Sequence, residues 1–517
     1  MTELLPNHLA GRWQSGTGSG TALVDPVLGD ELVRVDAAGL DLAAGFEFAR
    51  QTGSAALQAL RYRERGEMLA AAVRVLQANR EAYDRIATAN SGTTQADSGV
   101  DIEGAIYTLS VYAKLAASLP EGQFLPDGEP QSLARDGSFA TRHLQVPVSG
   151  LALFINAFNF PAWGLWEKAA PALLSGVPVV IKPATVTAWL TQRMVKDVVD
   201  AGVFPPGALS VVCGSSAGLL DALQPQDVLS FTGSAETAEL LRAHPAVTRR
   251  SVRVNIEADS VNSALLMPGA TPGSDAFDLF VKELAREMTQ KSGQKCTAIR
   301  RAFVPASVYG AVAEAVGERL ARIVVGNPRN ETVRMGSLVS RAQLAAVREG
   351  LARLSEVAQV LHDGSAVRLL DADPEVACCV GPTLLGLPTP EAVLATALVH
   401  EVEIFGPVAT LMPYADLPQA LQQVARGQGS LVASVYGADP TELARTALAL
   451  APLHGRVHVV DPSCAKTHTG HGNVMPQSLH GGPGRAGGGE ELGGLRALNF
   501  YHRRVAVQGA PAVLASL

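Results

Sequence analysis

The sequence predicts an α/β protein built around parallel sheets. Between residues 150 and 260, short apolar runs bounded by turn residues alternate with stretches of helical periodicity, the pattern of strands joined by crossover helices. A second pattern of the same kind follows residue 300. Polar or small residues stand at the ends of the predicted strands, which is the sheet edge where α/β proteins bind ligands.

Length and composition limit the class of protein. With 517 residues the chain has room for several domains, at roughly one per 150 residues. Hydrophobic residues make up 47% and charged residues 18%, which is typical of a globular protein with a large core. A net charge of −7 argues against a nucleic-acid partner, because phosphate binding needs clustered Lys and Arg.

The cysteines and the apolar runs predict a cytoplasmic protein. There are five cysteines, an odd number without Cys-x-x-Cys spacing, which favours reduced thiols over a disulfide framework. The N-terminus lacks the basic region and apolar run of a signal peptide. No apolar run approaches the roughly 18 residues of a membrane span, so no membrane partner is expected.

The N-terminal part is predicted to be mostly helical. Residues 8–35 read as short strands and turns, and 41–118 as helices. Within them, the apolar spacing from Arg65 to Ala89 predicts one helix that breaks before Gly92. Residues 119–147 are rich in Pro and Gly and are expected to leave the main body as an excursion.

The central segment carries the clearest alternation of strands and helices. The expected strands are Leu151–Ala157, Pro178–Pro183, Leu209–Cys213, Val228–Phe231 and Val252–Ile256. The expected helices are Trp163–Leu174, Thr187–Ala201, Ser216–Leu223 and Ala235–Ala243. The residues at the strand ends include Asn159, Lys182, Gly214, Gly233 and Glu257. Their shared place at one sheet edge predicts a cofactor site.

Cys296 is the candidate nucleophile. It follows a predicted helix over Asp278–Met288 that Gly293 would end, so it is expected on a loop, where reactive groups are often held. Lys295 precedes it and Arg300-Arg301 follow, and nearby cations lower the pKa of a cysteine. The alternative is a buried structural cysteine.

The α/β pattern continues to the C-terminus. Ala302–Pro305 is an expected strand, followed by a helix through Glu318–Ile323. Leu398–Phe405 reads as a further strand and turn, and Ala497–Gln508 alternates enough to be a strand.

The segment 463–494 is rich in Gly and His. Gly481–Gly489 resembles a phosphate loop only loosely, because no strand is predicted before it, and a flexible loop is expected. His468, His471 and His480 lack zinc-ligand spacing with carboxylate or thiol support, so no metal site is predicted.

Several short motifs, in order along nearly the whole chain, resemble the aldehyde dehydrogenase superfamily. They are Asn156-Ala-Phe-Asn-Phe-Pro161, Ile181-Lys-Pro-Ala184, Phe231-Thr-Gly-Ser234, Glu257, Gly293-Gln-Lys-Cys296 and Glu403-Ile-Phe-Gly-Pro407. The resemblance implies the aldehyde dehydrogenase fold, with three parts. These are a Rossmann-like dinucleotide-binding domain (1–127 and 148–258), an α/β catalytic domain (259–480), and a small β oligomerisation arm with the C-terminal segment (128–147 and 481–517). Such arms pair across a two-fold axis, so a homodimer is expected, with a tetramer as the alternative.

The resemblance also implies catalytic roles. Cys296 attacks the aldehyde carbon, and the Asn159 amide and the Cys296 backbone N–H hold the oxyanion. Hydride then passes to nicotinamide, and Glu257 activates the water that hydrolyses the thioester. Lys168 and Glu491 match positions that relay protons from Glu257.

The resemblance assigns further positions to cofactor binding. They are Phe158, Lys182, Thr185, Gly214, Phe231, Thr232, Gly233, Ser234, Ala258, Glu403 and Phe405. Glu403 matches the residue that binds the nicotinamide ribose, and Gly233-Ser234 open a helix whose N-terminus faces the pyrophosphate. Thr185 stands where NAD-preferring members often carry a glutamate that repels a 2′-phosphate. Thr185 beside Lys182 therefore predicts NADP as the cofactor, with NAD weaker.

Departures from the common family pattern indicate a branch. Glu257-Ala-Asp-Ser260 replaces the usual Glu-Leu-Gly-Gly and brings extra polarity near the base. This segment and the stretch from His480 to Gly494 resemble those of one branch of the family. The members of that branch oxidise CoA-thioester semialdehydes in aerobic aromatic degradation. The expected substrate is 3,4-dehydroadipyl-CoA semialdehyde of benzoate catabolism, oxidised to the acid. The dehydrogenase part of a phenylacetate ring-opening protein is similar, but its C-terminal hydratase domain is not expected here.

Three alternatives stay open. A CoA-acylating dehydrogenase would release its thioester to CoA, and the presence of Glu257 argues against it. A general NAD(P)-dependent dehydrogenase of small aldehydes would share the same machinery. A non-catalytic protein on this fold is also conceivable, although Asn159, Glu257, Cys296 and Glu403 together argue against it.

Overall fold

The computed structural model describes residues 2–517, and its two largest sheets have seven strands each. The first sheet has the order β13-β12-β9-β10-β11-β2-β3. Its strands are β2 (Asn7–Leu9), β3 (Arg12–Gln14), β9 (Ala152–Ile155), β10 (Val179–Lys182), β11 (Leu209–Val211), β12 (Val228–Thr232) and β13 (Arg253–Glu257). Strands β9 to β13 pair in parallel, so their carboxyl ends meet at one edge, as the sequence predicts.

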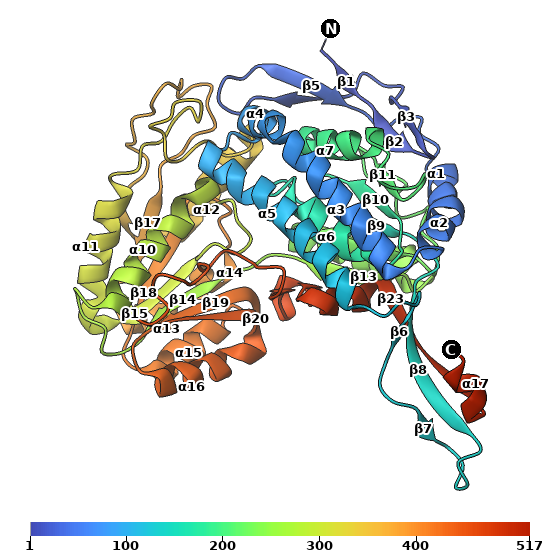
Figure 1. The fold of residues 1–517 in the computed structure, drawn as a ribbon. Helices are drawn as coiled ribbons and strands as arrows, with labels where there is room; N and C mark the ends of the chain where they lie inside the picture. The colour runs from blue at the N-terminus through green and yellow to red at the C-terminus, as the bar shows by residue number, and fades with distance from the viewer. Residues whose placement is uncertain (1) are drawn as a thin grey trace.

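The second sheet lies in a separate lobe beside the first (Figure 1) and has the order β16-β17-β18-β15-β14-β19-β20. Its strands are β14 (Ser263–Leu266), β15 (Arg301–Pro305), β16 (Gln359–His362), β17 (Thr383–Gly386), β18 (Val408–Tyr414), β19 (Ser430–Tyr436) and β20 (His454–Val460). Only β16 runs antiparallel to its neighbour among these strands. A small sheet of β1 (Leu4–Leu5), β5 (Glu31–Val35) and β4 (Thr21–Val24) lies near the N-terminus.

Helices cover both large sheets (Figure 1). In the first lobe they are α1 (Leu42–Phe48), α2 (Ser54–Gln58), α3 (Tyr62–Ala78), α4 (Arg80–Ser91), α5 (Gln95–Leu115), α6 (Trp163–Leu174), α7 (Ala188–Asp200), α8 (Ala235–Ala243) and α9 (Pro245–Thr248). In the second they are α10 (Asp275–Thr289), α11 (Tyr309–Leu320), α12 (Arg341–Ser355), α13 (Pro390–Ala395), α14 (Leu398–Glu401), α15 (Leu417–Ala425) and α16 (Pro440–Leu450). No helix among residues 2–517 is long and apolar enough to cross a membrane.

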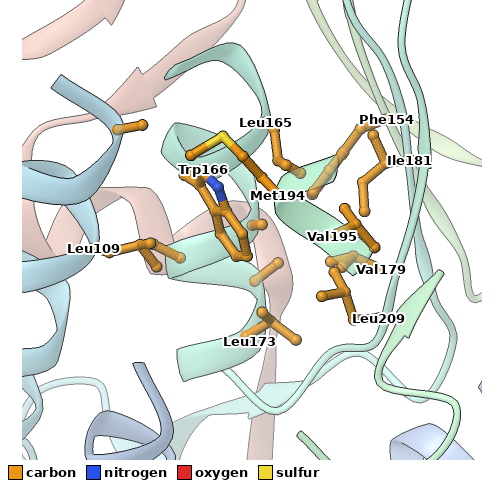
Figure 2. Packing of buried hydrophobic residues seen from close by; sticks show 14 of the residues in the cluster. Leu109, Phe154, Leu165, Trp166, Leu173, Val179, Ile181, Met194, Val195 and Leu209 are labelled. Carbon is orange, nitrogen blue, oxygen red and sulfur yellow. The ribbon is translucent and has the colours of Figure 1, made fainter. Parts of the chain in front are cut away.

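Helix α6 is buried because it is apolar on most of its circumference. Figure 2 shows Trp166 of α6 beside Met194 of α7, with Leu173 further along α6 and Phe154 on β9, and all four side chains are buried. Full burial of such large apolar side chains is the main stabilising contribution in this layer. It also fixes Lys168, on the same helix, in the interior.

Several predicted elements have different forms in the structure. The helix expected from Arg65 to Ala89 is divided into α3 and α4 at Asn79, whose side chain donates to the Val75 carbonyl (2.9 Å). An Asn side chain that bonds to the backbone competes with helical bonding. Ser216–Leu223 forms turns rather than a helix, because Gly218 adopts a left-handed conformation (φ +79°).

Two C-terminal expectations were also wrong. Leu398–Phe405 contains the short helix α14 and a loop rather than a strand, since a short apolar run does not by itself distinguish strand from helix. The Gly-rich segment is preceded by β21 (Leu479–Gly481), which pairs antiparallel with β22 (Glu490–Leu492). A Cβ on Gly481 would lie 2.0 Å from the Gly489 carbonyl oxygen, so close backbone packing explains these glycines.

A β arm projects from the body (Figure 1). Strand β8 (Ala140–Pro147) pairs antiparallel with β23 (His502–Gly509), and α17 (Pro511–Ala515) follows. The short strands β6 (Leu125–Pro126) and β7 (Gln131–Ser132) also pair with β8. The predicted strand from Ala497 begins only at β23, because 494–501 form a 3₁₀ helix.

Candidate active site

Two pockets meet between the sheets, and three of the predicted catalytic side chains line both of them. Asn159 follows β9, Glu257 ends β13, and Cys296 lies on the loop after α10. The larger pocket has a volume of about 590 Å³ and the smaller about 40 Å³. The structure therefore brings a nucleophile, an amide and a carboxylate to one junction.

The Cys296 loop has an unusual backbone. Lys291, Ser292 and Gly293 have φ values of 52°, 54° and 68°, in the left-handed region. A Cβ on Gly293 would lie 2.1 Å from the Gly406 carbonyl oxygen, so a larger residue cannot fit there. A strained backbone of this kind persists only where the surrounding contacts hold it in place, and such backbone is common at active sites.

The cations near Cys296 in sequence do not activate it. Lys295 is buried and donates to both carboxylate oxygens of Glu287 (2.8 Å each). Arg300 donates to the carbonyls of Gly293 and Lys295 (2.7 and 3.2 Å), which ties the loop together. Arg301 donates to the Val261 carbonyl, away from the thiol. The expectation that these cations lower the thiol pKa was wrong, because burial and nearby carboxylates outweigh them.

Burial instead raises the pKa of Cys296 well above its usual value, and the negative charge of Glu257 raises it further. Asn262 fixes the loop by donating to the Cys296 carbonyl (2.7 Å). Cys296 is therefore held as a thiol, and a base would be needed to convert it to a thiolate.

Glu257 is almost fully buried and forms an ion pair with His480, with Oε2 and Nε2 3.0 Å apart. Burial alone would raise the pKa of Glu257, but the His480 cation outweighs it and holds the pKa at about 2. Burial likewise opposes charge on His480, while Glu257 raises the pKa of that imidazole to about 9. One carboxylate oxygen of Glu257, one ring nitrogen of His480 and the Sγ atom of Cys296 all lie within 4.8 Å of one another.

The predicted relay residues meet beside this pair. Lys168 Nζ lies 2.9 Å from Glu491 Oε2 and 3.1 Å from Glu167 Oε1. Glu491 Oε1 accepts hydrogen bonds from Ser230 (2.7 Å) and Asn255 (3.0 Å). Burial raises the pKa of Glu167 to about 7, although Lys168 opposes the shift. A group that titrates near neutral pH can accept and release protons during turnover.

Asn159 supplies a free donor. Its side chain is buried, and its Nδ2 has no hydrogen-bond partner within residues 2–517. A buried donor without a partner is costly, and such groups often serve a ligand. Here the amide lines both pockets together with Cys296, where an oxyanion would form.

Most of the predicted cofactor residues line the larger pocket. They are Phe158, Phe231, Thr232, Gly233, Ser234, Ala258, Glu403 and Phe405. The rings of Phe158 and Phe405 meet edge to face, with centroids 5.6 Å apart. Glu403 accepts from the Ser260 backbone (3.0 Å), and burial raises its pKa to about 7. The two aromatic rings and the carboxylate suit a flat heterocycle joined to a sugar.

The other predicted cofactor residues cluster at the end of β10. Lys182 Nζ lies 3.4 Å from Thr185 Oγ1, and the Thr185 hydroxyl donates to the Gly214 carbonyl (3.1 Å). The N-terminus of α8 opens into the larger pocket at Ser234, which caps the helix. Asp259 accepts a hydrogen bond from the Ala235 N–H (2.9 Å), so one amide at that helix end is already engaged.

Sequence reasoning missed several pocket residues. His480 was considered only as a metal ligand without carboxylate or thiol support, yet folding places it beside Glu257 and Cys296. The other missed residues of the larger pocket include Gln343, Arg353, Glu401 and Arg485. Gln343 and Arg353 lie far from the motifs in sequence. Glu401 lies two residues before the Glu403 motif and Arg485 lies within the Gly-rich stretch, where nearness to a motif could have suggested them.

Comparison with known proteins gives a consistent result. The model of the aldehyde dehydrogenase family matches residues 13–507. A 3,4-dehydroadipyl-CoA semialdehyde dehydrogenase of Aromatoleum evansii is 55% identical over 93% of each chain. Among solved structures, aldehyde dehydrogenase C of Pseudomonas syringae with NAD+ and octanal has a TM-score of 0.82 at 24% identity, over 98% of this chain and 97% of the other. An NADP-dependent enzyme of E. coli has a TM-score of 0.83 at 23% identity, over 98% of each chain.

We expect Glu257→Gln to increase the alkylation rate of Cys296 by iodoacetamide at neutral pH, in protein free of cofactor. Removing the carboxylate charge lowers the thiol pKa and raises the thiolate fraction, roughly tenfold per unit of pKa. Mass spectrometry of the Cys296 peptide gives the rate, and Cys296→Ala supplies the background from the other cysteines. Slower alkylation in Glu257→Gln would contradict this electrostatic account.

Proposed function

The chain belongs to the aldehyde dehydrogenase family, and from that premise we propose that it oxidises a CoA-thioester semialdehyde to the acid with NADP as hydride acceptor. The observation that carries the chemistry is the meeting of Cys296, Asn159 and Glu257 where the two pockets join. The similarity to the Aromatoleum evansii relative supports 3,4-dehydroadipyl-CoA semialdehyde as the substrate, in benzoate degradation. A dehydrogenase of broader aldehyde specificity is the alternative.

In this scheme Glu257 takes the thiol proton, and Cys296 Sγ forms a bond to the aldehyde carbon. The Asn159 amide and the Cys296 backbone N–H hold the resulting oxyanion. A bound cofactor would supply the hydride acceptor beside this carbon, held by residues that include Phe158, Glu403 and Phe405. Loss of the hydride would leave the acyl group on Cys296 as a thioester. Glu257 then removes a proton from water, which hydrolyses the thioester to the acid and restores the thiol. Lys168 and Glu491 carry protons away from Glu257.

The smaller pocket supports a linear substrate. Phe160, Trp163 and Val474 are among its lining residues, and its volume of about 40 Å³ leaves room for little more than an extended chain. A CoA moiety would have to stay outside this channel while the aldehyde end reaches Cys296. A semialdehyde at the end of an unbranched acyl chain meets that requirement.

The cluster at the end of β10 supports NADP. Lys182 is a cation beside a hydroxyl, and the Thr185 position carries no carboxylate that would repel a 2′-phosphate. The buried ammonium and the neutral threonine favour the phosphate-bearing cofactor over NAD.

The arm supports a homodimer. Strand β23 is the terminal strand of its sheet, and Val505 on it is 39% exposed, next to a β8 strand that leaves the body. An edge strand has unpaired backbone groups and here an exposed valine, and pairing with a second copy would cover both.

The experiment that tests the function compares four cofactor reduction assays, with NAD or NADP and with the CoA-linked semialdehyde or hexanal. Reduction of NADP by the CoA-linked substrate, at least tenfold faster than in the other assays, is the expected result. Equal rates with hexanal would favour the broader dehydrogenase, and equal rates with NAD would overturn the cofactor assignment.

Thr185→Glu should reverse the cofactor preference. The new carboxylate repels the 2′-phosphate and competes for Lys182, a loss of about 2–3 kcal/mol, which corresponds to roughly 30- to 150-fold in kcat/KM for NADP. Activity with NAD should stay equal or rise. Thr185→Val, which has similar size and no charge, is the matched control and should affect NADP less. An unchanged ratio of NADP to NAD activity in Thr185→Glu would refute the assignment.

Val505→Asp should weaken the dimer at least tenfold, because a charge on the covered edge of β23 would lose its hydration. Analytical ultracentrifugation over a range of concentrations measures the change. Leu448→Asp, an exposed apolar position (75%) on α16, is the control and should leave assembly unchanged. A wild-type protein that sediments as a monomer, or a Val505→Asp protein that still dimerises like wild type, would contradict the proposal.

A further inference from the structure

His480 is buried at the active site, and the scheme above gives it no task. It lies on β21, directly opposite Glu491 of β22 in the hairpin register. Its Nε2 is 3.0 Å from Glu257 Oε2, and its side chain lines the smaller pocket with Cys296. Its neighbours include both the base and the nucleophile.

His480 lies among several buried carboxylates, whose ionised state depends on nearby cations. The groups that face it are Glu257 from β13, Glu167 and Lys168 from α6, Glu491 from β22, and Cys296 from its loop. Three carboxylates therefore share this buried space with one ammonium. Without a second cation, burial would favour protonation of at least one carboxylate.

Glu257 is the carboxylate with the greatest need of that second cation. Lys168 makes its direct contacts with Glu167 and Glu491. The contact of Glu257 with a cation is the one to His480 Nε2, and Glu257 Oε1 has no hydrogen-bond partner within residues 2–517. A protonated Glu257 could not accept a proton from the thiol or from water.

We propose that His480 is a positioning residue for thioester hydrolysis, whose imidazolium keeps Glu257 ionised and oriented towards Cys296. The inference rests on the proposed role of Glu257 as the base. In each cycle Glu257 takes one proton from water and passes it on to solvent through the neighbouring buried groups, and the His480 charge restores the carboxylate. The tight pairing of the two side chains makes the base available across the neutral pH range.

The pH dependence follows from the sign of the shift. A base works only when ionised, so hydrolysis is lost as the pH falls below the pKa of Glu257. With His480 present that pKa is held below its usual value, so no loss occurs near neutrality. In His480→Gln the amide can still donate to Glu257 but carries no charge. The effect of burial, which raises the pKa of Glu257, is then no longer offset by a cation, and that pKa rises. Activity is then lost at low pH and recovered at high pH.

The test uses the full-length protein and p-nitrophenyl acetate, an activated ester that acylates a thiol without aldehyde or cofactor. The burst of p-nitrophenol reports acylation, and the steady state reports hydrolysis of the acetyl-enzyme. For wild type we expect a nearly flat steady-state profile between roughly pH 5 and 8. For His480→Gln we expect at least a tenfold loss at the acid end of that range, with recovery to within a few fold at the alkaline end.

His454→Gln is the matched control, because His454 is also buried and bonds the Leu450 carbonyl (2.7 Å) outside the site. It should keep the wild-type profile. A His480→Gln profile that is unchanged, or lowered equally at every pH, would overturn the proposal, since equal loss indicates a purely structural role. A burst that persists in Cys296→Ala would instead reject the nucleophile of the proposed function.

Discussion

The active site depends on keeping one carboxylate ionised in the protein interior. Glu257 is buried beside a thiol whose pKa it raises, and an isolated buried carboxylate would be neutralised rather than charged. The ion pair with His480 and the adjacent Lys168 network offset that cost. Burial and the Glu257 charge therefore stabilise the resting thiol, and the cations keep ionised the carboxylate that we propose as the base.

This requirement explains why distant parts of the chain converge. Helix α6 brings Lys168, the end of β13 brings Glu257, and the β21–β22 hairpin brings His480 and Glu491. The hairpin can lie against β13 because Gly487 and Gly489 have no Cβ, which would lie 2.3 and 2.5 Å from the Ile256 carbonyl oxygen. The thiol comes from the other sheet, on a loop held by Arg300. The site is thus complete only when both sheets and the hairpin are assembled.

The sequence allowed prediction of the parallel sheet and of Asn159 and Glu257 at one sheet edge, because the carboxyl ends of parallel strands share that edge. Only the resemblance to the aldehyde dehydrogenase superfamily joined Cys296 to them. The sequence could not show where side chains point. Lys295 precedes the thiol in sequence but faces Glu287, and burial together with the Glu257 charge raises the thiol pKa instead of lowering it. His480 reaches Glu257 through a hairpin of two three-residue strands joined by a Gly-rich loop, and strands this short give a weak sequence signal. Its role depends on a tertiary contact that no local pattern records.

The most direct test of the account is a burst experiment on Glu257→Gln, with the CoA-linked semialdehyde and NADP in single and multiple turnovers. If Glu257 activates the hydrolytic water, about one NADPH per active site should form rapidly, followed by a steady rate at least a hundredfold below wild type. Mass spectrometry should find the acyl group on Cys296. A steady-state rate equal to that of wild type, without an accumulated acyl-enzyme, would contradict the central claim that the buried carboxylate is the base.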